Sequence, residues 1–211
     1  MLVEELMTRE VICLGPGDRV IDALRIAREK RIRHLPVTEG RRLVGIISDR
    51  DLRDAAPSTL VPGATMDILE NTLVGQIMHR EVITAHPLDP VGEAARLLYE
   101  HRIGCLPVVK GEELVGIVTE TDILRCLVEL MGVVRPGSHL EVEVPDRPGG
   151  LATVASIIKE HGVNVISVLT VPAGRPGHRL LVFRLETIDL RNIAREVAAA
   201  GYRVVWPVRE W

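Results

Sequence analysis

A ten-residue stretch of this chain occurs twice, and the duplication constrains the fold more than any other feature. LVGIISDRDL begins at Leu43 and LVGIVTETDI begins at Leu114. The aspartates that they contain, Asp51 and Asp122, lie 122 − 51 = 71 residues apart. At this shift, residues 7–52 and 78–123 align without a gap and are identical at 22 of 46 positions. The chain therefore contains a duplicated structural unit, and the two copies are expected to share one fold.

Composition predicts a globular protein and argues against nucleic acid as a partner. The 211 residues are 46% hydrophobic, which supplies a core for one or two domains. One Phe, two Tyr and two Trp provide few surfaces on which bases could stack. The net charge of −3 offers no basic field for a phosphate backbone.

The cysteines and the apolar runs predict a soluble cytoplasmic protein. Cys13, Cys105 and Cys126 are odd in number, lack CxxC spacing and follow no secretory leader, so we expect reduced thiols. The longest apolar runs fall well short of the roughly 18 residues that a membrane span needs. No membrane association is expected.

Each repeat predicts the element order β-α-β-β-α. Repeat 1 has β-type runs at 11–14, 34–38 and 43–48, with one helix expected after the N-cap Asp18 and a second helix expected to start at Asp49. Repeat 2 repeats this order, with strands at 82–85, 105–109 and 114–119 and a last helix over 120–131. The segment 57–75 joins the two copies.

The pattern changes after Val134. Residues 139–144 alternate with period two, and an amphipathic helix over 151–162 ends on a glycine. Strands at 164–171 and 178–186, a helix at 188–201 and a strand at 202–208 follow. The predicted order is the β-α-β-β-α-β of a ferredoxin-like fold. The fold class is thus α/β (α+β), with domains 1–60, 61–134 and 135–211.

No catalytic or metal-binding signature is present in the sequence. GxSxG, HExxH, P-loop and strand-following GxGxxG motifs are all absent. The seven histidines show no i, i+4 pairing, so no metal site, catalytic residue or cofactor is predicted. Cys105, beside the LPV run, is expected to be a half-buried structural thiol rather than a reactive one.

The duplicated element carries binding chemistry. The strand LVGII leads directly into a helix that opens with Ser48, Asp49, Arg50 and Asp51. Free N–H groups at a helix start favour an anion, and a carboxylate one turn later can accept hydrogen bonds from a ribose diol. A nucleotide combines both groups. Helix capping alone would explain these residues, and the equivalents Thr119 and Glu120, equally well.

The paired motifs hLPVh and LVGIhS/T with a terminal Asp resemble two CBS domains that form a Bateman module over 1–134. This resemblance implies adenosine ligands such as AMP, ADP, ATP or S-adenosylmethionine in clefts between the repeats. It also implies which residues bind the ligand. One cleft would contain Ser48, Arg50 and Asp51 facing His79, Ile83, Thr84 and Ile103. Its twin would contain Thr119 and Asp122 facing Thr8, Ile12, Cys13 and Ile32.

The resemblance further implies that the two clefts are unequal. Residues before the LPV strand often touch phosphate in this family. They are Arg33 and His34 in repeat 1 but Gly104 and Cys105 in repeat 2. Thr121 stands where repeat 1 has Arg50, so phosphate binding is expected mainly from repeat 1.

The motif DRPGGLATVASIIKEHGVNV resembles the ACT domain pattern over 138–211. The resemblance implies an amino-acid site in which the loop and helix start meet Asn164 of the partner subunit. The loop residues are Asp146, Pro148, Gly149, Gly150 and Leu151. The alternative is a tight turn, with the asparagine used only for packing in a dimer.

The order CBS-CBS-ACT resembles the bacterial acetoin-utilisation accessory proteins. It implies a non-catalytic homodimeric sensor. Binding of an adenine nucleotide, and of an amino acid at the ACT domain, would change the state of a regulated protein whose identity is unknown. Two alternatives remain open: a structural dimerisation adaptor with empty pockets, and an enzyme that uses the carboxylates around Asp49 and Asp51.

Overall fold

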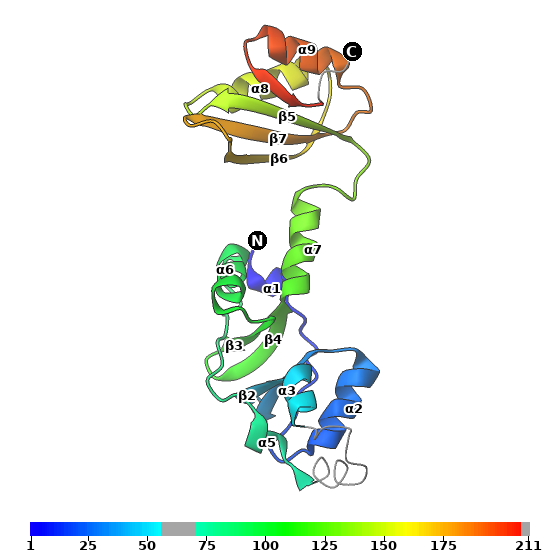
Figure 1. Ribbon diagram of the computed structural model, residues 1–211, viewed down its shortest axis with the longest axis vertical. Coiled ribbons are helices and arrows are strands. Elements are labelled where there is room, and N and C mark those ends of the chain that lie inside the picture. Colours follow the sequence, from blue (N-terminus) through cyan, green and yellow to red (C-terminus); the bar gives the residue numbers. More distant parts are fainter. Residues whose placement is uncertain (56–70, 208–211) are drawn as a thin grey trace. The chain divides into compact units, whose positions relative to one another are not determined.

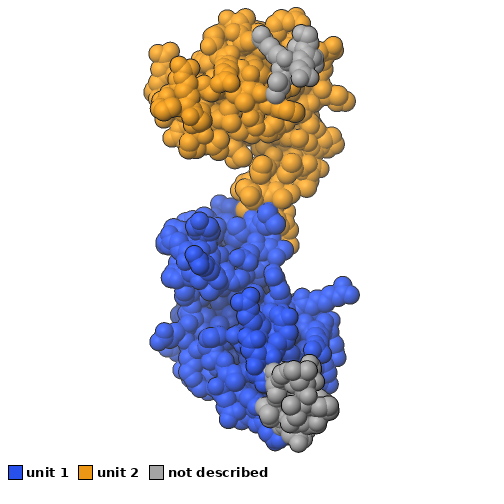
Figure 2. Space-filling model, viewed as in Figure 1, with its two compact units in different colours: residues 1–124 blue, residues 125–211 orange. Residues whose placement is uncertain are grey.

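The structure is a computed structural model that describes residues 1–55 and 71–207. The chain forms two compact units, residues 1–124 and 125–211 (Figure 2). The first unit contains the duplicated sequence, and the second contains the whole of the ferredoxin-like segment. Within the described ranges, no helix is both long enough and apolar enough to cross a membrane.

The two repeats form matching sets of helices and strands (Figure 1). Repeat 1 comprises α1 (Val3–Leu6), α2 (Val20–Lys30), β1 (His34–Glu39), β2 (Arg42–Ser48) and α3 (Asp49–Asp54). Repeat 2 comprises α5 (Val74–Ile77), α6 (Val91–His101), β3 (Cys105–Lys110), β4 (Glu113–Thr119) and α7 (Glu120–Leu130). The joining segment 57–75 lies outside the described residues up to position 70.

The first strand predicted for each repeat is wrong. Residues 11–14 and 82–85 contribute only single parallel bridges, Leu14 to Val37 and Ala85 to Val108. Prolines follow shortly after at positions 16 and 87 and cannot donate to a continued ladder. The predicted N-cap Asp18 is also wrong, because α2 has Arg19 at its N-cap and the Asp18 carboxylate accepts from the Gly15 N–H at 2.7 Å.

The four strands of the first unit form one antiparallel sheet in the order β1-β2-β4-β3. The two hairpins meet where Arg42 pairs with Glu113. On each side of this junction, a short segment of one repeat bridges a strand of the other. His79 pairs with Ile46 of β2, and Thr8 pairs with Ile117 of β4.

The first turns of the two repeats are exchanged between the two hydrophobic cores. Val74 and Met78 of repeat 2 pack with Leu35, Ile47 and other buried residues of repeat 1. Val3 and Met7 correspondingly pack into the core of repeat 2. Each core is therefore built from both copies, so neither repeat is complete by itself.

The second unit is ferredoxin-like, as predicted. Its elements are β5 (Ser138–Pro145), α8 (Gly150–Glu160), β6 (Val165–Pro172), β7 (His178–Leu185), α9 (Arg191–Ala199) and β8 (Arg203–Trp206). The antiparallel sheet has the order β6-β7-β5-β8, and α8 and α9 cover one face of it (Figure 1). Val142, Phe183, Ile158 and Val197 are among the buried residues between the sheet and the helices.

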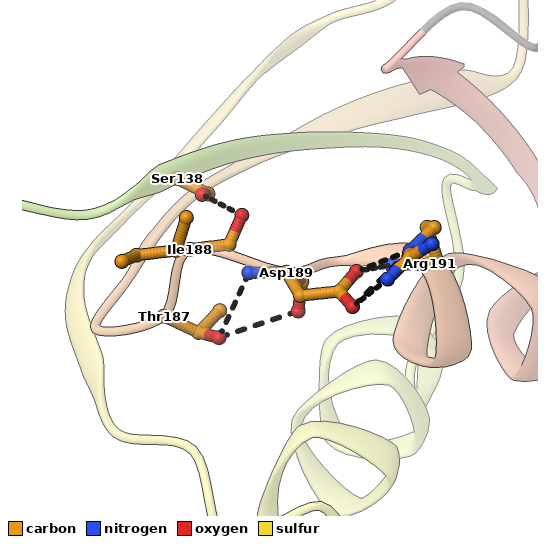
Figure 3. A network of polar contacts seen from close by, with 5 residues as sticks. All are labelled: Ser138, Thr187, Ile188, Asp189 and Arg191. Carbon is orange, nitrogen blue, oxygen red and sulfur yellow. Dashed lines mark hydrogen bonds and ion pairs between the residues drawn. The ribbon is translucent and has the colours of Figure 1, made fainter.

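A polar turn sets the start of α9 (Figure 3). The Asp189 carboxylate accepts from the Arg191 backbone N–H at 2.9 Å and from the Arg191 guanidinium at 2.6 Å. These bonds lower the pKa of Asp189 to about 2. The Thr187 hydroxyl donates to the Asp189 carbonyl, and the Ser138 hydroxyl donates to the Ile188 carbonyl at 3.2 Å. The connection between β7 and α9 is thus held by side chains of residues 187–191 and by Ser138 of β5.

Candidate functional site: a cavity shared by the two repeats

A cavity of about 530 Å³ lies in the first unit where the two repeats meet. Both repeats contribute to it, because β2 leads into α3 on one side and the exchanged segment after α5 passes on the other. The lining residues are Arg33, His34, Ile46, Ser48, Asp49, Arg50, Asp51, His79, Glu81, Val82, Ile83, Arg102, Ile103, Gly104, Cys105, Pro107 and Glu120.

Asp51 lies in the wall of the cavity at the first turn of α3. One carboxylate oxygen, Oδ2, accepts from the Ser48 N–H at 2.8 Å and from the Ser48 hydroxyl at 2.6 Å, which completes a capping box. The other oxygen, Oδ1, lies 3.2 Å from Nε2 of His79. Burial opposes ionisation, but the bonds from Ser48 and His79 lower the pKa of Asp51 overall. Asp51 is therefore an ionised acceptor at neutral pH.

His34 reaches across from repeat 1 to Gly104 of repeat 2. A Cβ atom at position 104 would lie 2.7 Å from Cε1 of His34, so only glycine leaves room for the ring in this position. Burial and then the charge of Arg33 lower the pKa of His34, while Asp49, Glu120 and Asp51 act in the opposite direction. The His34 imidazole thus lies near both a positively charged arginine and negatively charged carboxylates.

The cavity carries cations without protein partners. Among the described residues, the guanidinium groups of Arg33, Arg50 and Arg102 make no hydrogen bond or ion pair. The lining also contains four carboxylates, of which Asp49 pairs with Arg53 at 2.9 Å and Asp51 meets His79. Free guanidinium groups beside carboxylates suit a ligand that combines an anionic group with neutral hydroxyls.

The polar groups of the cavity do not form a serine-histidine pair. The Ser48 hydroxyl donates to the Asp51 carboxylate, whose lowered pKa makes it a weak base, and His79 contacts Asp51 rather than Ser48. Burial raises the pKa of Cys105 to about 12, which keeps its thiol protonated. Within residues 1–55 and 71–207, no cluster of His, Cys, Asp and Glu is arranged to hold a metal ion.

The structure brings most of the first predicted cleft together. Ser48, Arg50, Asp51, His79, Ile83 and Ile103 all line the cavity, together with Arg33, His34, Gly104 and Cys105. Thr84 does not line it. The predicted twin set Thr8, Ile12, Cys13, Ile32, Thr119, Thr121 and Asp122 does not line this cavity either.

The twin aspartate has the same local structure in a different setting. Asp122 accepts from the Thr119 N–H at 2.9 Å and from the Thr119 hydroxyl at 2.7 Å, as Asp51 does from Ser48. Asp122 is buried, however, whereas Asp51 is half-buried and lines the cavity. Ile32 lines an adjoining hollow of about 450 Å³ between α2 and α3, which shares Arg33 and Asp49 with the cavity and also contains Arg28, Arg31 and Arg53.

Sequence reasoning missed several cavity residues. Glu81, Val82, Arg102, Pro107 and Ile46 were not among the predicted site residues, and Glu120 was considered only as a helix cap. A shift of 71 residues places Arg102 on Arg31, an arginine in the same local motif. The same shift also places Glu81, Val82, Pro107 and Ile46 on identical residues, so identity between the repeats marks these positions but does not tell site residues from core residues.

The predicted amino-acid site of the second unit is divided between the two ends of the sheet. Asp146 follows the last residue of β5 and accepts from Nε of Arg179 at 3.3 Å. Asn164 precedes β6 at the opposite end, where Val165 pairs with Leu185 and Leu185 pairs with Ser138. Within one chain these two residues therefore cannot bind the same ligand.

The loop residues of that site form the start of α8. Gly149 has a φ of 106°, a backbone conformation that favours glycine. Gly150 packs closely against Val144, because a Cβ atom at position 150 would lie 3.2 Å from the Val144 side chain. Pro148 and Leu151 flank them, and Leu151 is exposed. The Asn164 side chain donates to Glu186 at 3.3 Å.

Two family models match the chain. The model of the CBS domain matches residues 3–58 and 74–129. The model of the TTHA0829-like ACT domain matches residues 136–209.

Curated relatives match the region of the repeats. A CBS domain-containing protein of Dictyostelium discoideum is 35% identical over 143 residues, which are 65% of this chain and 99% of that protein. A 33.4 kDa protein of Thermofilum pendens is 35% identical over 136 residues, which are 62% of this chain and 45% of that protein. The chain thus spans less than half the length of the second relative.

Solved structures match the same region. A Vibrio cholerae protein described as an acetoin utilization protein (AcuB) is 33% identical with a TM-score of 0.54, over 64% of this chain and 98% of that one. The CBS domain pair of protein MJ0100, in complex with 5′-methylthioadenosine and S-adenosyl-L-methionine, is 29% identical with a TM-score of 0.52, over 64% and 98%. CBSX2 in complex with AMP is 29% identical with a TM-score of 0.54, over 61% and 97%.

Proposed function

Because this chain belongs to the CBS domain family, with a CBS pair followed by an ACT domain, we propose that it is a non-catalytic sensor of adenine nucleotides. The ligand would bind in the cavity that contains Asp51. The observation that carries this proposal is the combination of an ionised carboxylate with three unpaired guanidinium groups in one cavity of about 530 Å³. Complexes of related CBS proteins with AMP and with S-adenosyl-L-methionine support it.

The cavity offers a partner for each part of an adenine nucleotide. The half-buried Asp51 carboxylate would accept from the ribose diol through Oδ1, in competition with the His79 ring. Ile83 and Ile103 provide apolar surface for the base. Arg33 and Arg50 provide charge-assisted hydrogen bonds to phosphate.

The first test compares two aspartates that share one local structure. Calorimetric titration with ATP, ADP, AMP and adenosine is expected to show that Asp51→Ala lowers affinity by about 1–3 kcal/mol, the cost of leaving the hydroxyl partners unpaired. Asp122→Ala is the matched control, because it removes an equivalent cap that does not line the cavity. Equal affinity in Asp51→Ala and wild type, with loss in Asp122→Ala, would place the ligand in the other cleft. A wild-type protein that binds none of the four would contradict the proposal itself.

The enzyme alternative has less support. The base that contacts the Ser48 hydroxyl is the Asp51 carboxylate, which is weak because its pKa is lowered, and the protonated Cys105 is a poor nucleophile. Incubation with ATP, followed by chromatography of the nucleotides, distinguishes the two functions: a sensor returns ATP unchanged, and an enzyme returns product.

The wider role extends beyond the cavity. Nucleotide would favour one conformation of a cytoplasmic homodimer, and an amino acid held between Asp146 and Asn164 of the partner subunit would be a second input. The separation of Asp146 from Asn164 within one chain supports a site that needs two subunits. The regulated pathway would be acetoin utilisation or a similar one, which rests on the resemblance to the Vibrio cholerae protein. The alternative of a dimerisation adaptor with an empty cavity predicts no binding in the titration.

A further inference from the structure

Two arginines end helices in a backbone conformation that the chain otherwise reserves for glycine. Arg31 follows α2 with φ 54° and ψ 39°, and Arg102 follows α6 with φ 53° and ψ 43°. They are the only non-glycine residues with positive φ in residues 1–55 and 71–207. The left-handed region is unfavourable for a residue with a Cβ atom.

The other long helices show that an arginine is not needed to end a helix in this chain. Glycines with positive φ follow α7, α8 and α9, at Gly132 (66°), Gly162 (66°) and Gly201 (88°). The backbone at positions 31 and 102 would accept glycine equally well. A side chain that is present where the backbone disfavours it points to a role of the side chain.

The two arginines differ in what they can reach. Arg102 lines the cavity close to Gly104, whereas Arg31 lines the adjoining hollow, which shares Arg33 and Asp49 with the cavity, and does not line the cavity itself. Both side chains are exposed, and neither guanidinium makes a hydrogen bond or ion pair with a described residue. Arg102 is thus a free cation at the rim of the cavity, and Arg31 is its counterpart outside the cavity.

We propose that Arg102 is a specificity-determining residue that binds the anionic group carried by an adenosine ligand. This inference rests on the proposed function of the cavity. A guanidinium group presents a planar fork of donors that matches phosphate or carboxylate. The anionic group is the phosphate chain in ATP and the amino-acid carboxylate in S-adenosylmethionine. Adenosine and 5′-methylthioadenosine carry neither group and serve as uncharged references.

The test uses the full-length protein and two variants that carry the same substitution at equivalent left-handed positions. Arg102→Gly and Arg31→Gly each replace a left-handed arginine by glycine, so both should shift Tm by a similar amount in the same direction. Calorimetry with ATP, adenosine, S-adenosylmethionine and 5′-methylthioadenosine then separates the side-chain role from the backbone effect. Arg102→Asn, which also tolerates the left-handed region, provides a second variant.

We expect Arg102→Gly and Arg102→Asn to weaken binding of the anionic ligand roughly 10- to 100-fold while leaving its uncharged reference nearly unchanged. Arg31→Gly should bind as wild type does. Weaker binding of ATP by the Arg102 variants identifies phosphate as the group that Arg102 binds, and weaker binding of S-adenosylmethionine identifies carboxylate. The inference is overturned by unchanged binding in Arg102→Gly, by an equal loss for charged and uncharged ligands, or by the same loss in Arg31→Gly. Failure of wild type to bind any of the four ligands would instead remove the proposed function, and this inference with it.

Discussion

His34 and Gly104 show how one residue pair shapes the cavity. The ring of His34 lies where a side chain at position 104 would have to go. The equivalent residues by the 71-residue shift are Cys105 and Arg33, so the contact between the repeats has no symmetric copy with the same residues. The two repeats therefore differ here in side-chain size as well as in charge, and the inequality of the clefts stays a prediction.

Gly104→Ala tests this contact. Its Cβ atom would displace the His34 ring, and we expect weaker nucleotide binding with little loss of fold stability, because the ring end can rotate away. The measurement is a double-mutant cycle with His34→Ala. In the His34→Ala background, Gly104→Ala should have almost no further effect, which corresponds to a coupling of about 0.5–3 kcal/mol. Additive effects of the two substitutions would show that the pair does not act through contact.

The lowered pKa of His34 predicts a dependence of stability on pH. The folded state holds the His34 pKa below its ordinary value of 6.5, so the unfolded state binds more protons between the two values. The contribution of His34 to the free energy of unfolding is fully present above pH 6.5 and is lost as the pH falls below 6.5 towards the pKa of the folded state. Asp51 behaves differently, because its lowered pKa makes its contribution disappear only as pH falls below about 3.8.

Urea unfolding between pH 7.5 and 5 measures this effect. We expect the free energy of unfolding to fall with pH in this range and expect His34→Gln to reduce the slope. An unchanged slope in His34→Gln would assign the pH dependence to other histidines.

At the scale of secondary-structure elements, the segments exchanged between the repeats pack closely on the strands of the other repeat. The chain after α5 passes so close to β2 that a Cβ atom at Gly45 would lie 2.6 Å from Sδ of Met78 and 2.9 Å from the carbonyl oxygen of His79. Gly116 in β4 leaves the same room for Met7 and Thr8. These glycines allow each repeat to complete the core of the other, and on one side they place His79 beside Asp51.

Gly45→Ala and Gly116→Ala form a matched pair. Each is expected to destabilise the protein by about 1–3 kcal/mol through overpacking, measured by chemical denaturation. Gly45→Ala should also weaken nucleotide binding, because the backbone of His79 must move, whereas Gly116→Ala should not. Equal effects on affinity would indicate that the second cleft binds ligand as well.

At the scale of the whole molecule, exposed strand edges favour self-association. The sheet of the second unit ends in β6 and β8, where Val168, Val171 and Trp206 are 40%, 37% and 49% exposed. Unpaired edges with apolar side chains tend to be covered in stable proteins. We therefore expect a dimer or larger assembly.

Light scattering at micromolar concentration checks this expectation. The mass should be at least twice the 23.3 kDa of one chain. A truncated chain of residues 1–134 serves as the control: it keeps every cavity residue and lacks the exposed edges, so it should bind nucleotide like the full chain and show weaker association. A mass of 23.3 kDa for the full chain would contradict the prediction.

The segment that follows α7 belongs structurally to the second unit. The chain that follows α7 is held on the sheet, since Ser167 donates to the Met131 carbonyl at 2.9 Å and Arg184 donates to the Arg135 carbonyl at 3.0 Å. A Cβ atom at Gly132 would lie 2.6 Å from Ile166. Residues 131–135 are therefore fixed to the sheet of the second unit.

The sequence by itself determined the element types, the duplication and the two domain families. Local periodicity decides whether a segment forms a helix or a strand, and the repeated Asp51 and Asp122 motifs form equivalent caps for this reason. The local patterns failed at 11–14 and 82–85, where the residues looked like strands but proline prevented a ladder.

Only the tertiary structure decided which residues share a site. Val3 and Val74 are equivalent by the repeat, so an exchanged and an unexchanged arrangement contain the same residue types, and no local pattern distinguishes them. The exchange brings His79 to Asp51. It is the same for both repeats, so the position of Asp122 outside the cavity and the presence of Arg102, but not Arg31, in its lining come from the packing of the residues that differ between the repeats. These outcomes depend on how distant segments pack together, and a local sequence pattern does not record that packing.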